Sequence, residues 1–385
     1  MRLLLLSSEF PPGPGGIGTH AFHLASQLAC RGLELHVLSP QDYASEKEVS
    51  GFNASQPFEI TCLPSMGNKL IQSYTRYKTV RQAIKTLKPD LMIASGSRAV
   101  YLVALLTLFR KTPWLVIGHG TEFGARNILQ KVLTRIACNQ ASGIICVSDY
   151  TKQVVESLGV NKVPIFVIHN GADQNAFYQL PGDEVTEFRK NAQVSGKFVL
   201  LTVGNVSDRK GQEVVIRALP GILDQVPIAV YWMAGLPQKQ AFLASLADQL
   251  GVAHAIRFWG KVSLEQLRML YNACDLFLMT SRQCADGDFE GFGIAVIEAA
   301  LCGKPAVVSD NSGLAEAVSD NQTGFLVPQN DPVATAQAVI KLAQSPTLLS
   351  AMANQAYHQA IAHQTWDHVG SQYLDVIHKI INPSS

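Results

Sequence analysis

Short hydrophobic runs alternate with longer amphipathic stretches along the whole chain. Short runs rich in Leu, Ile and Val are typical of buried strands, and apolar positions that recur at helical spacing indicate helices between them. This alternation predicts an α/β fold with mostly parallel, doubly wound sheets covered by helices on both faces. The predicted strands are residues 3–8, 34–39, 91–94, 114–118, 143–147, 165–168, 198–203, 228–234, 256–259, 276–280, 305–308 and 324–327.

The alternation of strands and helices is interrupted near residues 173–196 by a more polar segment. A chain of 385 residues is also long for one hydrophobic core. We therefore predict two Rossmann-like domains, over residues 1–175 and 196–364, and a helix over 365–385 that crosses back to the first domain. Ligands of parallel sheets bind at the carboxyl ends of the strands, so we expect both domains to face an interdomain cleft that holds the active site.

The formal net charge of +1 argues against a nucleic-acid-binding protein whose affinity depends on positive charge. The charge is unevenly divided, because residues 1–175 hold 17 Lys and Arg against 11 Asp and Glu. Residues 69–88 hold six basic residues and no acidic one, with apolar residues at helical spacing. Such a helix either contacts an anionic membrane surface or packs its apolar face on its own sheet, and the sequence leaves both open.

The seven cysteines form no Cys-x-x-Cys pair, and most lie in apolar runs. We expect reduced core residues, which indicates a reducing compartment. The leucines at residues 3–6 are followed by no small-residue cleavage site, so we interpret them as a strand rather than a signal peptide. The longest other apolar run, residues 99–109, is too short to span a bilayer. We therefore expect a cytoplasmic protein, soluble or peripheral at the inner face of the cell membrane.

A glycine-rich loop follows the first predicted strand and opens a helix. Gly13, Gly15 and Gly18 match the spacing of a dinucleotide-binding fingerprint. However, three prolines stiffen the loop, and no carboxylate ends the second predicted strand to bind a ribose hydroxyl. These departures disfavour a nucleotide-dependent oxidoreductase. Free amides at a helix start still suit an anionic or hydroxyl-rich ligand, so we predict that the loop contacts one.

Two further motifs in the second half carry charge suited to a phosphorylated sugar. Arg209 and Lys210 follow a predicted strand, where they could neutralise a diphosphate. Glu290 and Glu298 enclose a glycine-containing helix start, and their spacing of about two turns places them on a similar face. Two carboxylates so placed can bind hydroxyl groups of one extended ligand, while the amides between them suit phosphate or sugar oxygens.

Together these motifs resemble the retaining GT-B glycosyltransferases of family 4 (glycosyl transferases group 1). Glu290 and Glu298 match the E-x7-E motif of that family, and the resemblance covers essentially the whole chain. The other matching segments are Gly15-Gly16, Gly118-His119-Gly120, Val147-Ser148, Asn170-Gly171-x-Asp173, Arg209-Lys210-Gly211, Cys302-Gly303-x-Pro305, Gly313-x-x-Glu316 and Thr323-Gly324-Phe325-Leu326-Val327. The segments 118–122, with Thr121, and 286–290, with Asp286, are most similar to phosphatidylinositol mannosyltransferases. They also resemble those of bacterial exopolysaccharide glucosyltransferases.

The resemblance implies that the first domain binds the acceptor and the second binds the nucleotide sugar. The implied catalytic residues are His119, Arg209, Lys210 and Glu290, and the implied donor-binding residues are Gly15, Gly16, Asn205, Lys261, Val262, Phe292, Gly293, Ile294 and Glu298. Glu298 would bind the ribose, Lys210 would stabilise the departing diphosphate, and His119 would touch the donor sugar. Asn205 stands where the family usually has a second basic residue, so charge compensation would depend more on Arg209 and Lys210.

The implied reaction is transfer of a hexose with retained configuration to a polysaccharide-precursor or lipid-linked acceptor. We expect UDP-glucose as the donor, with GDP-mannose as the alternative, and no cofactor or metal ion. The ten histidines show no metal-ligand spacing. A UDP-sugar 2-epimerase is disfavoured by the glutamate pattern. A non-catalytic sugar-nucleotide-binding protein is disfavoured because Lys210, Glu290 and Glu298 are all present.

Overall fold

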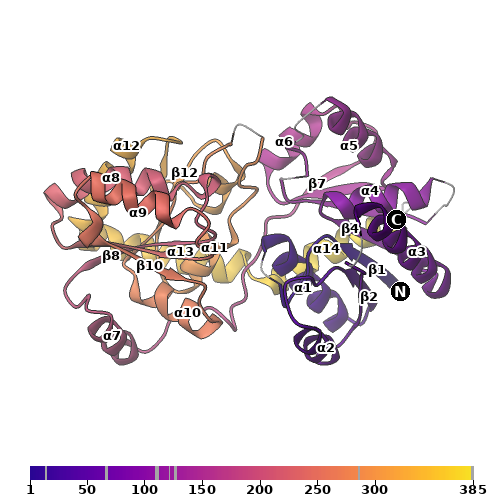
Figure 1. The fold of residues 1–385 in the computed structure, drawn as a ribbon, viewed down its shortest axis with the longest axis horizontal. Helices are drawn as coiled ribbons and strands as arrows, with labels where there is room; N and C mark the ends of the chain where they lie inside the picture. The colour runs from indigo at the N-terminus through magenta and orange to yellow at the C-terminus, as the bar shows by residue number, and fades with distance from the viewer. Residues whose placement is uncertain are drawn as a thin grey trace. The chain divides into compact units, whose positions relative to one another are not determined.

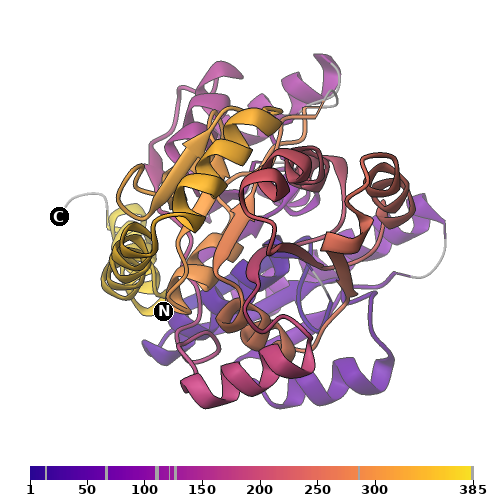
Figure 2. The same ribbon diagram turned by 90° about the vertical axis from the view of Figure 1, so that its left-hand side faces the viewer.

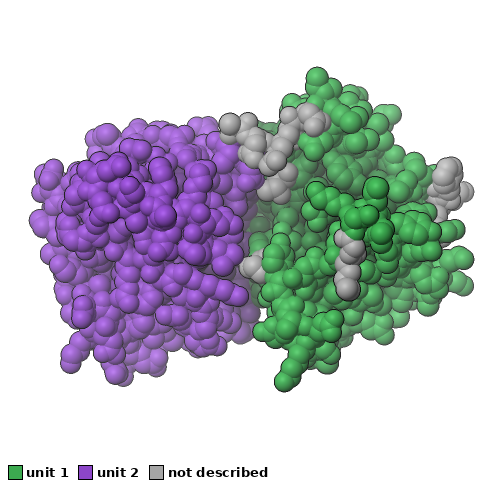
Figure 3. Space-filling model, in the orientation of Figure 1, with its two compact units in different colours: residues 1–170, 366–385 green, residues 171–365 purple. Residues whose placement is uncertain are grey.

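Strands and helices alternate along the chain (Figure 1). The computed structural model describes residues 1–13, 15–65, 68–108, 112–120, 122–124, 128–284 and 287–382. The chain divides into two compact units, coloured separately in Figure 3. Unit 1 consists of Met1–Asn170 and Trp366–Ser385, and unit 2 of Gly171–Thr365.

Unit 1 contains a seven-stranded parallel sheet with the order β3-β2-β1-β4-β5-β6-β7. Its strands are β1 (Arg2–Ser7), β2 (Glu34–Ser39), β3 (Glu59–Cys62), β4 (Leu91–Ser95), β5 (Trp114–Gly118), β6 (Gly143–Cys146) and β7 (Ile165–Val167). Its helices are α1 (Gly16–Cys30), α2 (Glu46–Ala54), α3 (Lys69–Leu87), α4 (Ser97–Thr107), α5 (Ile128–Gln140), α6 (Asp149–Ser157) and α14 (Trp366–Ile381).

Helices cover both faces of this sheet. Buried side chains of α3, α4, α5 and α6 form one core with residues of β1, β4, β5 and β6. Right-handed crossovers place α1 on the opposite face, because β1 leads to β2 in one direction while β3 to β7 proceed in the other. Helix α14 packs on α1, where Tyr373 Oη lies 3.0 Å from His20 Nε2 and Arg31 Nη2 donates to Asp367 Oδ1 at 2.9 Å. The terminal helix is therefore part of the core of unit 1.

Unit 2 contains a six-stranded parallel sheet with the order β10-β9-β8-β11-β12-β13 (Figure 2). Its strands are β8 (Phe198–Val203), β9 (Ala229–Ala234), β10 (Ile256–Gly260), β11 (Leu276–Met279), β12 (Ala306–Ser309) and β13 (Gly324–Val327). Its α-helices are α7 (Gly182–Asn191), α8 (Gln212–Gln225), α9 (Gln240–Gln249), α10 (Leu264–Ala273), α11 (Ile294–Leu301), α12 (Pro332–Ala343) and α13 (Pro346–His363). Three 3-10 turns are η1 (Asp208–Lys210), η2 (Ala253–Ala255) and η3 (Gly313–Ala317).

The twelve predicted strands are all present, and their ends differ from the prediction by at most one residue. The sequence analysis missed β3, a strand at the edge of the first sheet whose residues are partly or fully exposed. An edge strand of this kind needs no continuous hydrophobic run, so its sequence shows little strand signal.

The polar segment expected to separate the domains belongs to unit 2 from Gly171 onward. Arg189 on α7 donates to the carbonyl oxygen of Ala273 at 2.8 Å and pairs with Asp275. The Leu180 amide donates to Asn272 Oδ1 at 2.8 Å. These bonds attach the segment to α10 and the start of β11, so most of it is docked structure rather than a linker.

None of the seven cysteines forms a disulfide bond, and Cys138, Cys146, Cys274 and Cys302 are buried as expected, whereas Cys30 and Cys62 are exposed. In the part of the chain that the structure describes, no helix combines the length and the apolar character needed to cross a membrane.

Candidate active site

The residues of unit 2 that the sequence analysis assigned to the donor site all follow strands. Asn205, Arg209 and Lys210 follow β8, Lys261 and Val262 follow β10, and the segment 290–298 lies beyond β11. Because these strands are parallel, their carboxyl ends lie at the same edge of the sheet. The fold thus brings three separate segments to one edge of unit 2.

At this edge a carboxylate is held between two cations. Lys210 Nζ lies 2.8 Å from Glu290 Oε2, and Arg209 Nη1 donates to the same oxygen. Arg209 also pairs through Nε with Asp288 Oδ2 at 3.1 Å. Glu290 is only 9% exposed. Burial alone would raise its pKa, but Arg209 and Lys210 outweigh that effect and lower the pKa to about 2. Glu290 is therefore ionised at neutral pH.

This ion-pair cluster can bind both charged and hydroxyl groups. Glu290 fixes the positions of Arg209 and Lys210, whose remaining N–H groups are suited to phosphate oxygens. Carboxylate oxygens accept hydrogen bonds from sugar hydroxyls. The sequence analysis named these three residues but not Asp288 as a partner, because the pairing depends on how the loop before α11 folds back.

Glu298 lies on α11, and its Oε2 accepts a hydrogen bond of 2.6 Å from Tyr271 Oη on α10. Burial raises the pKa of Glu298 to about 7, although the Tyr271 bond and the charge of Lys210 oppose the shift. Glu298 is thus near its midpoint of ionisation at neutral pH. Tyr271 was not predicted, because it lies on another helix 27 residues earlier and belongs to no local motif.

Gly293 directly precedes α11 and has a φ of 88°, a conformation that favours glycine. A Cβ atom there would also lie 2.5 Å from Leu314 Cδ1. No side chain caps the helix at this position, so the first amides of α11, at Ile294 and after it, suit an anionic ligand. Phe292 is 1% exposed, so it can offer a ligand only its backbone.

The remaining predicted residues of unit 2 lie at the same edge of the sheet. Asn205 is exposed, and its carbonyl oxygen accepts a bond of 3.2 Å from Gln212 Nε2. Lys261 is exposed and Val262 is partly buried after β10, which is two strands away from β8. Their position allows contact with a ligand that extends along the edge. Asp286, which the sequence analysis included in the loop motif, lies outside the described residues.

In unit 1, His119 follows β5 and contacts the end of the neighbouring strand. Its Nε2 lies 2.9 Å from Ser95 Oγ, and its ring meets the His20 ring edge-on at 4.7 Å between centroids. Burial lowers the pKa of His119 to about 3, so the imidazole is neutral at physiological pH. It can therefore accept or donate a hydrogen bond but cannot serve as a cation. Ser95 and His20 were not predicted, and Thr121 lies outside the described residues.

The predicted glycine loop lies at the start of α1, also in unit 1. Gly15 has a φ of 141°, and a Cβ atom there would lie 2.1 Å from Glu9 Oε2. Gly16 faces open space, because nothing lies within 4 Å of its ideal Cβ position. Only glycine therefore fits at residue 15, and the backbone at residue 16 is accessible to a ligand.

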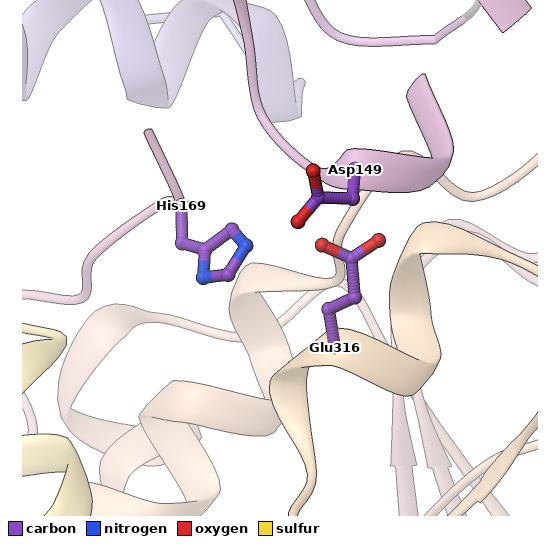
Figure 4. A group of neighbouring side chains, drawn as sticks. All are labelled: Asp149, His169 and Glu316. Atoms are coloured by element: carbon purple, nitrogen blue, oxygen red, sulfur yellow. The ribbon is translucent and has the colours of Figure 1, made fainter. Parts of the chain in front are cut away.

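Figure 4 draws three side chains with metal-binding atoms: Asp149, His169 and Glu316. Asp149 begins α6 and His169 follows β7, both in unit 1, whereas Glu316 lies on η3 in unit 2. Each unit by itself holds at most two of them, fewer than the three or four protein ligands of a typical zinc site. We assign no metal to either unit on these residues.

Family models match both units. Residues 14–176 match the model described as Glycosyltransferase Family 4, and residues 183–359 match Glycosyl transferases group 1. Glycogen synthase of Mycobacterium tuberculosis is 27% identical, with 98% of this chain and 94% of that protein aligned. The GDP-mannose-dependent alpha-(1-6)-phosphatidylinositol monomannoside mannosyltransferase of Mycolicibacterium smegmatis is also 27% identical, over 97% of this chain and 98% of that protein.

Solved structures show the same fold. HepE of Anabaena, crystallised in complex with UDP and glucose, superposes with a TM-score of 0.83 at 22% identity and covers 98% of this chain and 100% of its own. Sucrose-phosphate synthase of Thermosynechococcus elongatus superposes with a TM-score of 0.82 at 17% identity over the full length of both chains. Both family models and these likenesses agree with the predicted family and fold. The chain therefore belongs to the glycosyltransferases, with a family 4 domain, a group 1 domain and the GT-B fold.

Proposed function

We propose that this glycosyltransferase moves a hexose from UDP-glucose to a saccharide or lipid-linked acceptor, with retention of configuration and without a metal ion. The observation that carries the proposal is the cluster of Arg209, Lys210 and Glu290, with Glu298 on the neighbouring helix. It combines cations for a diphosphate with carboxylates for hydroxyl groups, which is the chemistry of a nucleotide diphosphate sugar.

In the proposed reaction the bond between the sugar C1 and the diphosphate oxygen breaks, and a bond from C1 to the acceptor oxygen forms on the same face. The acceptor proton passes to the departing phosphate. Negative charge grows on the diphosphate as the sugar becomes oxocarbenium-like, so Arg209, Lys210 and the amides at the start of α11 stabilise the transition state. These groups take the place of a divalent cation. Neutral His119 contributes a hydrogen bond to the donor sugar.

Two comparisons with known proteins bear on the identity of the sugar nucleotide donor. HepE, which shares the fold, has been solved with UDP-glucose, and this favours UDP-glucose for the present chain. The mycobacterial mannosyltransferases are named as GDP-mannose-dependent, and this supports GDP-mannose as the alternative. The groups that hold the diphosphate and ribose serve either donor, so the base and the sugar hydroxyls decide between them.

We propose that the acceptor binds to unit 1, as a precursor in exopolysaccharide synthesis. A polar cavity of about 250 Å³ lies at the carboxyl ends of β1, β2 and β4, lined by Ser8, Glu9, Ile17, Pro40, Asp42, Tyr43, Ser97 and Arg98. Carboxylates, hydroxyls and a guanidinium in one cavity match a hydroxyl-rich acceptor.

Helix α3 supports peripheral contact with an anionic membrane surface, where a lipid-linked acceptor would lie. Val80 and Ile84 pack into the core of unit 1, whereas Leu70, Ile71 and Tyr74 are exposed on the first two turns. The helix therefore buries one part of its apolar surface and leaves another part exposed. Its lysines and arginines would attract anionic headgroups.

Calorimetric titration with UDP, GDP, UDP-glucose and GDP-mannose, in the presence of a chelator, tests the proposed donor. We expect UDP and UDP-glucose to bind at least about tenfold more tightly than the guanosine compounds, a difference of about 1.4 kcal/mol. The opposite preference would replace UDP-glucose by GDP-mannose. Binding that appears only after a divalent metal is added would contradict the metal-independent reaction.

Glu298→Gln should weaken donor binding at pH 8 by about 1–3 kcal/mol, because the ribose hydroxyls lose a charged acceptor. With a pKa of about 7, the wild-type carboxyl is ionised above that pH and becomes protonated as the pH falls through it. The difference between variant and wild type should therefore shrink at pH 6. Glu187→Gln, an exposed glutamate of α7, is the matched control. Equal donor affinity of Glu298→Gln and wild type at pH 8 would refute the ribose assignment.

Lys210→Ala should lower kcat by about 100-fold or more while changing donor affinity much less, because charge on the diphosphate grows in the transition state. Lys341→Ala, on the exposed side of α12, controls for the loss of a lysine and should leave kcat unchanged. A variant that lost affinity and kept its kcat would show that Lys210 only binds the ground state.

Charge reversal of Lys78, Arg81 and Lys85, all exposed on α3, tests the membrane contact of this helix. We expect lower co-sedimentation with anionic vesicles and unchanged titration with UDP, because these residues lie outside the donor site. Unchanged co-sedimentation would leave α3 as a helix that only packs on its own sheet.

A further inference from the structure

The outward surfaces of α4 and α5 carry an unusual number of exposed apolar side chains. On α5, Ile128 is 81% exposed and Leu129 is 68% exposed. The full set, named here the α4–α5 patch, comprises Tyr101 and Leu105 of α4, Leu108 just after α4, and Ile128, Leu129, Val132, Leu133 and Ile136 of α5. Single exposed apolar residues are common on proteins, but several on one helix face mark an interaction surface.

Helix α5 is oriented so that its apolar face is exposed to solvent. Its five exposed apolar residues fall within an arc of about 140° at 3.6 residues per turn. Thr134, Ala137 and Cys138 are buried on the other side of the helix, toward the core. Helix α5 is therefore apolar on the face that points away from the protein, the reverse of an ordinary surface helix.

The two helices hold this surface in a defined arrangement. Helices α4 and α5 pack against each other, and Tyr101 Oη of α4 lies 2.6 Å from Thr134 Oγ1 on the buried side of α5. Val103 and Ala104 of α4 and Ala137 of α5 belong to the same core. The helices that carry the patch are therefore packed on the sheet of unit 1.

The charges at the patch are of one sign. Lys131 and Arg135 are exposed beside the apolar arc of α5, and Arg98 is exposed at the start of α4. Among the described residues between 97 and 140, the acidic side chain is Glu122, which is buried. An apolar surface bordered by cations is the pattern of a helix that lies in the interface of an anionic bilayer.

We propose that the α4–α5 patch inserts into the surface of an anionic lipid bilayer. The apolar side chains of α5 enter the boundary between headgroups and acyl chains, and Lys131 and Arg135 pair with lipid phosphates. A second copy of this chain fits less well, because its patch would bring cations against cations. In the proposed function, helix α3 supports an acceptor that lies near a membrane. The insertion of the α4–α5 patch is a separate proposal, which requires neither a particular donor nor a particular acceptor.

Helix α3 shares the core over this face of the sheet with α4 and α5. Its cations would strengthen attraction to the same leaflet, but the apolar residues that anchor the protein would belong to α5. Charge on α3 and apolar insertion through α5 can therefore be separated by mutation.

The test is co-sedimentation of the full chain with phosphatidylcholine vesicles and with vesicles that also contain phosphatidylglycerol. Leu129→Gln with Leu133→Gln should lower partitioning into the anionic vesicles about tenfold or more, because two apolar side chains no longer transfer from water. The control is Phe242→Gln with Val333→Gln, two exposed apolar residues of unit 2. This control should sediment like the wild type.

Lys131→Glu with Arg135→Glu should reduce partitioning into the anionic vesicles by about fivefold or more for each residue. UDP titration of every variant reports the fold and the donor site separately from the vesicle assay. The proposal is overturned if the α5 variants sediment like the wild type, or if the wild type binds neither vesicle. It is also overturned if the wild type forms a dimer that Leu129→Gln with Leu133→Gln dissociates, since the patch would then bind a second copy.

Discussion

The buried charge of Glu290 is the constraint on which the candidate site at the carboxyl ends of the unit 2 strands depends. An ionised carboxylate that is largely removed from water carries a large desolvation cost unless cations and hydrogen bonds compensate. Lys210 at 2.8 Å and Arg209 provide that compensation, and Arg209 is itself held by Asp288. The cluster therefore joins the turn after β8 to the loop before α11. In the proposed reaction, a diphosphate would meet cations that are already in position, which would reduce the reorganisation needed in the transition state.

The parallel sheets explain why the candidate residues of each unit gather at one edge. In unit 2 they follow β8, β10 and β11, and in unit 1 the neighbouring strands β4 and β5 end at Ser95 and just before His119. The local environments then assign different ionisation states. Glu290 is held ionised by its cations, Glu298 has a pKa of about 7, and the pKa of His119 is lowered to about 3 by burial. One edge thus offers permanent charge, and the other offers a neutral hydrogen-bonding group.

The helices that cover one face of the sheet in unit 1 combine core packing with an outward surface that is cationic and partly apolar. Val80 of α3 and Ala137 of α5 complete the core, whereas Tyr74 and Leu129 on the same helices are exposed. A helix in a globular protein normally exposes polar residues, so this distribution is not explained by folding alone. The proposed contact with anionic lipid would account for both the apolar residues and the charge, and it agrees with the proposal of a lipid-linked acceptor.

The sequence by itself determined the succession of strands and helices, the family motifs and the chemical type of the residues proposed to bind the donor. Buried parallel strands are continuous apolar runs, and the glutamate and glycine spacings are local, so both can be detected without coordinates. Only the tertiary structure decided that Tyr271 binds Glu298, that Ser95 meets His119 and that Asp288 holds Arg209. The structure also added β3 and the apolar face of α5 that points outward. No local sequence pattern encodes how the helices and strands pack against one another. That packing decides which distant segments touch and in which direction an apolar helix face points.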